Sequence, residues 1–101
     1  MELSELRLEH FEPLVSQVFR LALPGSKDWY RFELVDVRAS RFRDSKRSQR
    51  KPFSLLFKGP GEFAFPQATY QVEHDTLGKL EFLLVPVIVE EEGRFLEAVF
   101  T

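Results

Sequence analysis

Two histidines and sixteen acidic residues are the side chains of this 101-residue chain that could bind a metal or move protons. His10 lies beside Glu9, and His74 lies between Glu73 and Asp75. Metal sites need three or four converging ligands, and neither histidine belongs to a motif that supplies them. We therefore expect no metal site. His74 is predicted to be a strand-end residue that hydrogen-bonds locally, and His10 a surface residue of a helix.

Motifs for nucleophilic catalysis and for phosphate binding are also missing. Ser54 lies in an apolar run and has no Gly-x-Ser-x-Gly context, which favours a strand residue. The Gly-Pro-Gly turn at residues 59–61 contains a proline, which lacks the N–H that a phosphate cradle would use. The chain has no cysteine. We expect a protein that is not an enzyme and has no cofactor or small-molecule substrate, with His74 and Glu73 as the alternative acid–base pair.

The charge is concentrated in residues 38–51, which hold half of the fourteen basic residues and a single acid, Asp44. A basic loop over residues 39–51 could contact phosphates, with binding that weakens as salt rises. The alternative is a solvated loop that offsets an acidic body, because one aromatic residue, Phe42, is a poor stacking platform. The candidate contacts for an anion or partner are Arg41, Arg43, Lys46, Arg47, Arg50 and Lys51.

A second candidate surface is the apolar run of residues 82–89. Both faces of a strand would be apolar here, so either the fold buries both faces or one face meets another protein. Internal burial is our first expectation and a protein interface the second. The residues concerned are Leu83, Val85, Val87 and Val89. The run is too short to span a bilayer and the acidic N-terminus is unlike a signal peptide, so we expect a cytoplasmic protein without membrane contact.

The elements that must position these residues are predicted from the spacing of apolar side chains. Residues 2–14 have the spacing of a short helical segment rather than of a strand. Six alternating stretches follow, and a one-residue phase change after Leu34 indicates a β-bulge. A turn from Asp75 to Gly78 predicts a hairpin with the glycine in the left-handed conformation. The predicted strands span residues 17–23, 29–37, 53–57, 68–74, 79–89 and 95–100.

Short strands without crossover helices predict a single, mainly β domain over residues 1–101. The expected architecture is a small antiparallel β-sandwich or partly closed β-barrel of about six strands with a short N-terminal helix. The last two strands are expected to pair antiparallel. Pro86 indicates an edge or a bulge in the fifth strand, because it cannot donate a ladder hydrogen bond.

Several stretches of the chain resemble one protein family. They are the central run Arg-Lys-Pro-Phe-Ser-Leu-Leu-Phe-Lys-Gly-Pro at residues 50–60, the segments 66–70 and 74–78, the opening 8–15, and the close at 84–87 and 97–100. Over nearly its whole length the chain resembles the DUF6916 family of small bacterial and phage-associated domains of unknown function. The resemblance implies no catalytic residues. It implies an assembly role, linked to a phage-tail-like or cell-surface structure.

Together these features give a hypothesis and an alternative. The hypothesis is a non-enzymatic protein-interaction or assembly module that binds another protein or itself through its apolar fifth strand. The alternative is an anion or nucleic-acid binder that uses the basic segment 38–51.

Overall fold

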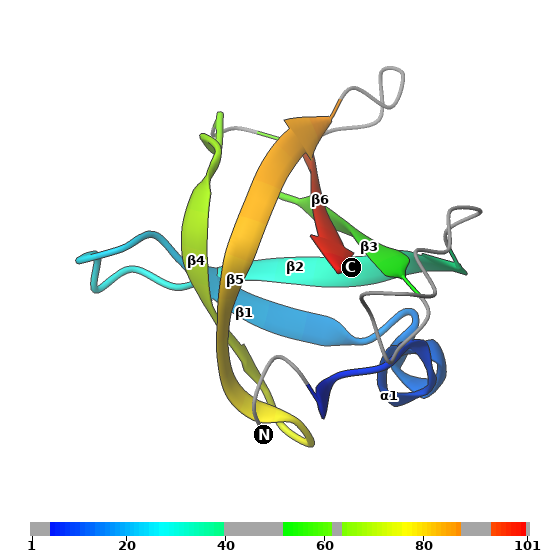
Figure 1. Ribbon diagram of the computed structural model, residues 1–101. Coiled ribbons are helices and arrows are strands. Elements are labelled where there is room, and N and C mark those ends of the chain that lie inside the picture. The colour runs from blue at the N-terminus through cyan, green and yellow to red at the C-terminus, as the bar shows by residue number, and fades with distance from the viewer. Residues whose placement is uncertain (1–4, 40–51, 62–63, 88–93, 101) are drawn as a thin grey trace.

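The computed structural model describes residues 5–39, 52–61, 64–87 and 94–100, and its strands form a closed six-stranded barrel (Figure 1). The order of strands around the barrel is β1-β2-β3-β6-β5-β4, and every neighbouring pair is antiparallel. The prediction of a mainly β domain is confirmed, and the barrel is fully closed. The elements are α1 (Leu8–Phe11), a 3-10 helix η2 (Glu12–Leu14), β1 (Val18–Ala22), β2 (Tyr30–Ala39), β3 (Phe53–Gly59), β4 (Ala68–His74), β5 (Gly78–Val87) and β6 (Arg94–Phe100).

The strands follow the alternation of the sequence. Phe53, Leu55 and Phe57 of β3 point inward and are completely buried, as the spacing predicts. The predicted bulge in β2 is confirmed. Leu34 pairs with Phe57, but the register then shifts before the next pair, so the strand gains one residue over its partner.

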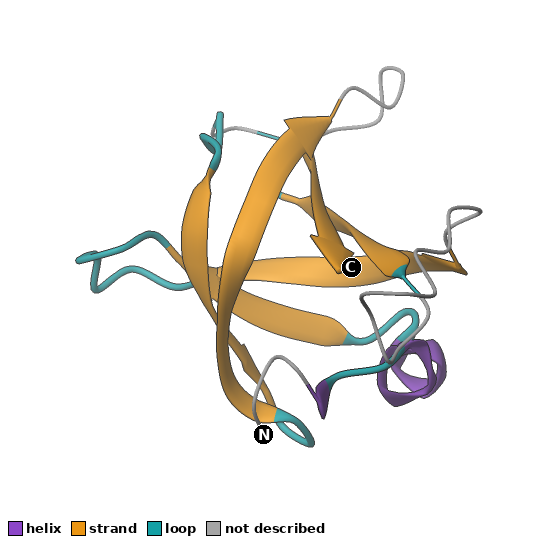
Figure 2. Ribbon diagram, viewed as in Figure 1, coloured by secondary structure: helices purple, strands orange, loops and turns teal. Residues whose placement is uncertain are grey.

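One end of the barrel is closed by the N-terminal helical turns (Figure 2). The Phe11 ring of α1 lies 5.8 Å from the Phe53 ring and 6.1 Å from the Phe100 ring, measured between centroids. Phe53 and Phe100 are themselves stacked at 4.8 Å. The predicted N-terminal helical segment is therefore confirmed, although within the described part of residues 2–14 the α-helical turn begins only at Leu8.

The start of α1 has an unusual cap. Arg7 precedes the helix, and its backbone N–H donates a hydrogen bond to Nδ1 of His10 at 2.9 Å. In a capping box this backbone group is normally satisfied by a Glu or Gln side chain. His10 lies near the surface, as predicted, and its ring takes over this capping role.

The other end of the barrel is filled by Phe65, whose ring lies 5.0 Å from that of Tyr30 and 4.8 Å from that of Phe32. Nearby, the buried Tyr70 hydroxyl donates a 2.6 Å hydrogen bond to the carbonyl oxygen of Pro66. Burial raises the pKa of Tyr70 to about 12. Aromatic side chains thus close both ends of the barrel, and the candidate sites lie on its outside.

β5 curves from β4 to β6 (Figure 1), and it changes neighbours as it does so. Its first part pairs with β4 up to Leu84, and its last part pairs with β6 over Val85–Val87. Pro86 lies beyond the last pair with β4, in agreement with the predicted edge. The pairing of the last two strands is confirmed, but the longer ladder of β6 is with β3.

Candidate functional site

His74 is fixed by hydrogen bonds at both of its ring nitrogens. Nδ1 accepts from the backbone N–H of Thr76 at 3.0 Å and of Leu77 at 3.4 Å. Because Nδ1 is an acceptor, the proton is on Nε2, which donates to the Gln17 side-chain oxygen at 2.8 Å. The ring is 3% exposed and packs 4.4 Å from the Phe19 ring. The prediction of a locally hydrogen-bonded strand-end histidine is confirmed.

His74 and Glu73, the alternative acid–base pair, lie on different sides of β4. Burial lowers the pKa of His74, the Asp75 carboxylate opposes this effect and the Arg20 guanidinium adds to it. Glu73 lies on the outer face of β4, where it binds Arg20, so its carboxylate and the buried imidazole do not converge. In the described part of the chain, no three His, Asp or Glu side chains gather closely enough to hold a metal ion.

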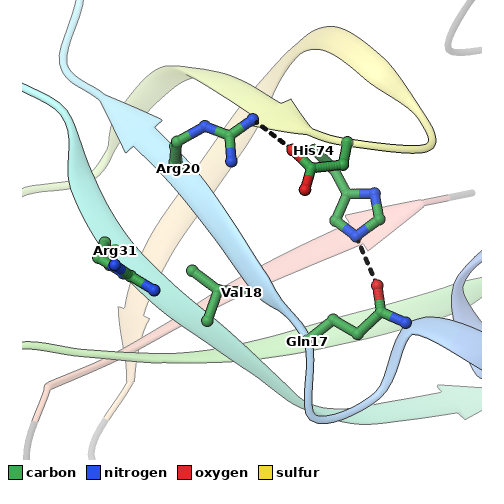
Figure 3. A pocket seen from close by; sticks show the side chains of 6 residues that line it. Gln17, Val18, Arg20, Arg31 and His74 are labelled. Atoms are coloured by element: carbon green, nitrogen blue, oxygen red, sulfur yellow. Dashed lines mark hydrogen bonds and ion pairs between the residues drawn. The ribbon is translucent and has the colours of Figure 1, made fainter.

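A half-open hollow of about 390 Å³ lies outside the barrel beside β1 and β2 (Figure 3). Arg20 and Arg31 face each other across these strands. Arg20 binds Glu73 at 2.9 Å and Asp75 at 3.1 Å, and these hydrogen bonds raise its pKa. The residues that line the hollow are Gln17, Val18, Arg20, Arg31, His74 and Asp75.

Sequence reasoning did not find this hollow. The alternation placed Arg20 and Arg31 on outer faces, but only the register of β1 against β2 makes them direct neighbours. A turn of uncertain length separates the two strands in the sequence, so the register could not be derived from the spacing alone.

Apolar side chains collect on the outer face of three neighbouring strands, β3, β6 and β5. Glu97 of β6 lies between Leu56 of β3 and Val85 of β5. Two of the apolar side chains are well exposed, Leu83 at 50% and Val99 at 63%. We call this surface the outer strip, and its exposed or partly exposed apolar residues are Leu56, Leu83, Val85, Val87 and Val99.

The outer strip includes three of the four residues predicted as an interface. Leu83 faces outward, so our first expectation, internal burial, is wrong for this side chain. Val85 and Val87 are partly exposed, and Val89 lies outside the described residues. The contribution of Val99 was not predicted, because the expected pairing of the last two strands did not give their register or the ladder of β6 with β3.

The basic segment falls almost entirely outside the described residues. Its first residue, Arg38, is an exposed residue of β2 that forms an ion pair with Asp36. The other candidate contacts are not placed: Arg41, Arg43, Lys46, Arg47, Arg50 and Lys51.

Within the described ranges, no helix combines the length and apolar character needed to cross a membrane. Neither a curated protein nor a solved structure matches the chain significantly. The family model of a domain of unknown function, DUF6916, matches residues 6–100. Since this match covers nearly the whole barrel and its helical end, the chain belongs to the DUF6916 family.

Proposed function

We propose that the protein is a non-enzymatic protein-interaction module whose outer strip docks onto another protein or onto a second copy of the chain. The observation that supports this proposal most is the exposure of Val99 and Leu83, at 63% and 50%, on the outer faces of neighbouring strands. Single exposed apolar residues are common on protein surfaces, whereas a contiguous group marks an interaction site.

Closure of the barrel determines how a partner would bind. The strands pair in a ring, so a partner has no full-length sheet edge to extend. Strand ends such as β2 beyond Leu34 and β5 beyond Leu84 lack a neighbouring strand on one side within the described residues, and in β5 Pro86 offers no N–H to a further strand. A partner would therefore pack on outward side chains. Burying what remains exposed of Leu83 and Val99 would contribute roughly 1 kcal/mol each.

Photo-cross-linking tests the proposal directly. A photoreactive residue at position 99, the most exposed apolar position of the strip, is expected to give a product heavier than the 11.8 kDa chain. The matched control is the same residue at position 9, because Glu9 is exposed on α1 at the end of the barrel. Mass spectrometry of the product then identifies the partner as a copy of the chain or as another protein.

The proposal is contradicted if position 99 gives no product, or if positions 99 and 9 give the same products in equal yield. The expected link to a phage-tail-like or cell-surface assembly stays a prediction. The same holds for anion or nucleic-acid binding, since the basic residues 41–51 lie outside the described part of the chain.

A further inference from the structure

Within the described residues, the Arg31 side chain has no ion-pair partner, although the Asp75 carboxylate lines the same hollow. Arg20 is its direct neighbour across β1 and β2, and like charges in this position repel. Arg20 is compensated by Glu73 and Asp75. In the part of the chain that the structure describes, the Arg31 side chain makes no hydrogen bond and no ion pair. A ligand that brings one negative charge to Arg31 would therefore be favoured.

The surroundings of Arg31 indicate a carboxylate on a protein surface. Arg31 and the half-exposed Val18 line the same hollow (Figure 3). Trp29 precedes Arg31 by two residues, is 43% exposed, and is of a type that is enriched with arginine at the centres of protein interfaces. One guanidinium matches one carboxylate in charge, and the nearby Asp75 would repel a doubly charged phosphate more strongly than a singly charged carboxylate.

The chain itself carries a matching carboxylate. Glu97 is a half-buried acid in the middle of the outer strip, and within the described ranges its side chain has no hydrogen bond and no ion pair. Apolar side chains flank it on both neighbouring strands, namely Leu56 and Val85. Burial of such an acid against a partner requires a cation opposite it.

Glu97 cannot reach Arg31 of its own chain. In the ring of strands, β3 separates β2 from β6 on one side, and β4 separates β1 from β5 on the other. β1 and β2, which carry Arg20 and Arg31, therefore lie across the ring from β6 and β5 of the outer strip. An ion pair between these two residue types can therefore form only between two molecules.

We propose that copies of this chain associate head to tail, with the Arg31 face of one copy on the outer strip of the next and Arg31 paired with Glu97. This inference rests on the proposed function and names the partner. Val18, which lines the hollow with Arg31 and is 38% exposed, would meet the exposed apolar side chains of the strip. When two copies associate through two different faces, one copy keeps a free Arg31 face and the other keeps a free outer strip. Further copies can bind there, so the assembly grows into a ring or a filament.

A charge exchange tests the pairing. Sedimentation velocity is measured over a range of concentrations for the native chain, Arg31→Glu, Glu97→Arg and an equimolar mixture of the two variants. Each variant alone places like charges in the contact and is expected to associate at least tenfold more weakly than the native chain. The mixture offers opposite charges at every contact and is expected to recover association. Arg94→Gln, an exposed arginine at the start of β6, is the matched control and is expected to behave as the native chain.

The head-to-tail inference is overturned if the native chain sediments as a monomer at all concentrations, or if both charge variants associate as the native chain does. It is also overturned if the mixture behaves like its separate components. The proposed function is tested separately. A cross-link from position 99 to a different protein would support it even when the chain does not self-associate. Unfolding curves of each variant show that a loss of association is not a loss of folding.

Discussion

At the scale of the residue, His74 is a structural histidine. Its imidazole accepts hydrogen bonds from the turn between β4 and β5 and donates one to Gln17, which precedes β1. One ring therefore holds a hairpin turn and the start of another strand together. Protonation at Nδ1 would remove the acceptor on which the turn depends.

This arrangement predicts that acid destabilises the protein through His74. Burial lowers the pKa of His74 below its ordinary value of 6.5 in the folded state. The unfolded chain therefore binds the proton more readily than the folded chain. The contribution of neutral His74 to the unfolding free energy is complete above about pH 6.5 and is lost as pH falls through the lower folded-state pKa. The unfolding free energy changes there by at most about 1.4 kcal/mol per pH unit.

Urea unfolding at several pH values between 5 and 8 measures this slope. His74→Gln cannot titrate, so the pH dependence of its unfolding free energy is expected to be flatter than that of the native protein below pH 6.5. Equal pH dependence in both proteins would show that protonation of His74 is not linked to unfolding.

At the scale of the element, the end of β3 depends on close contact between a backbone and a ring. A Cβ atom on Gly59 would overlap the ring of Phe32. The glycine does not have a positive φ, so any cost of a larger residue comes from this overlap. We expect Gly59→Ala to lower the unfolding free energy by about 1–3 kcal/mol or more.

Gly61 provides the comparison, because a Cβ atom there would meet nothing within 4 Å. Gly61→Ala is expected to change the unfolding free energy by less than about 0.5 kcal/mol. The double variant Phe32→Leu/Gly59→Ala should lose less stability than the sum of its single changes, because the smaller side chain relieves the overlap. Equal effects of the two glycine substitutions in chemical denaturation would disprove the overlap.

Most elements of this fold could be predicted, because the alternation of apolar and polar residues is a local property. The bulge after Leu34 could be predicted for the same reason, since it reverses the alternation within one strand. The capping role of His10 could not be predicted. Arg7 is not a typical capping residue, and the sequence gave no sign that a histidine would accept the hydrogen bond of its backbone N–H.

At the scale of the whole molecule, the candidate surfaces depend on strand order and register, which local patterns do not determine. The apolar face of β5 was visible in the sequence, but β6 completes the outer strip by adding Val99 from a ladder that only the closed barrel specifies. The Arg31 face likewise arises from the pairing of β1 with β2.

The central claim is that the outer strip serves association rather than folding. It is tested most directly by the mass of the native particle isolated from the producing cells, compared with that of Leu83→Asp/Val99→Asp. Both side chains are at least half exposed, so the double variant is expected to lose no more than about 1 kcal/mol of stability. Val15→Asp, at an exposed apolar residue away from the strip, is the control.

The account predicts a native particle heavier than the 11.8 kDa chain, an equally heavy particle for the Val15 control, and a folded 11.8 kDa monomer for the double variant. A native particle of 11.8 kDa, or a double variant that keeps the full native mass, would contradict it.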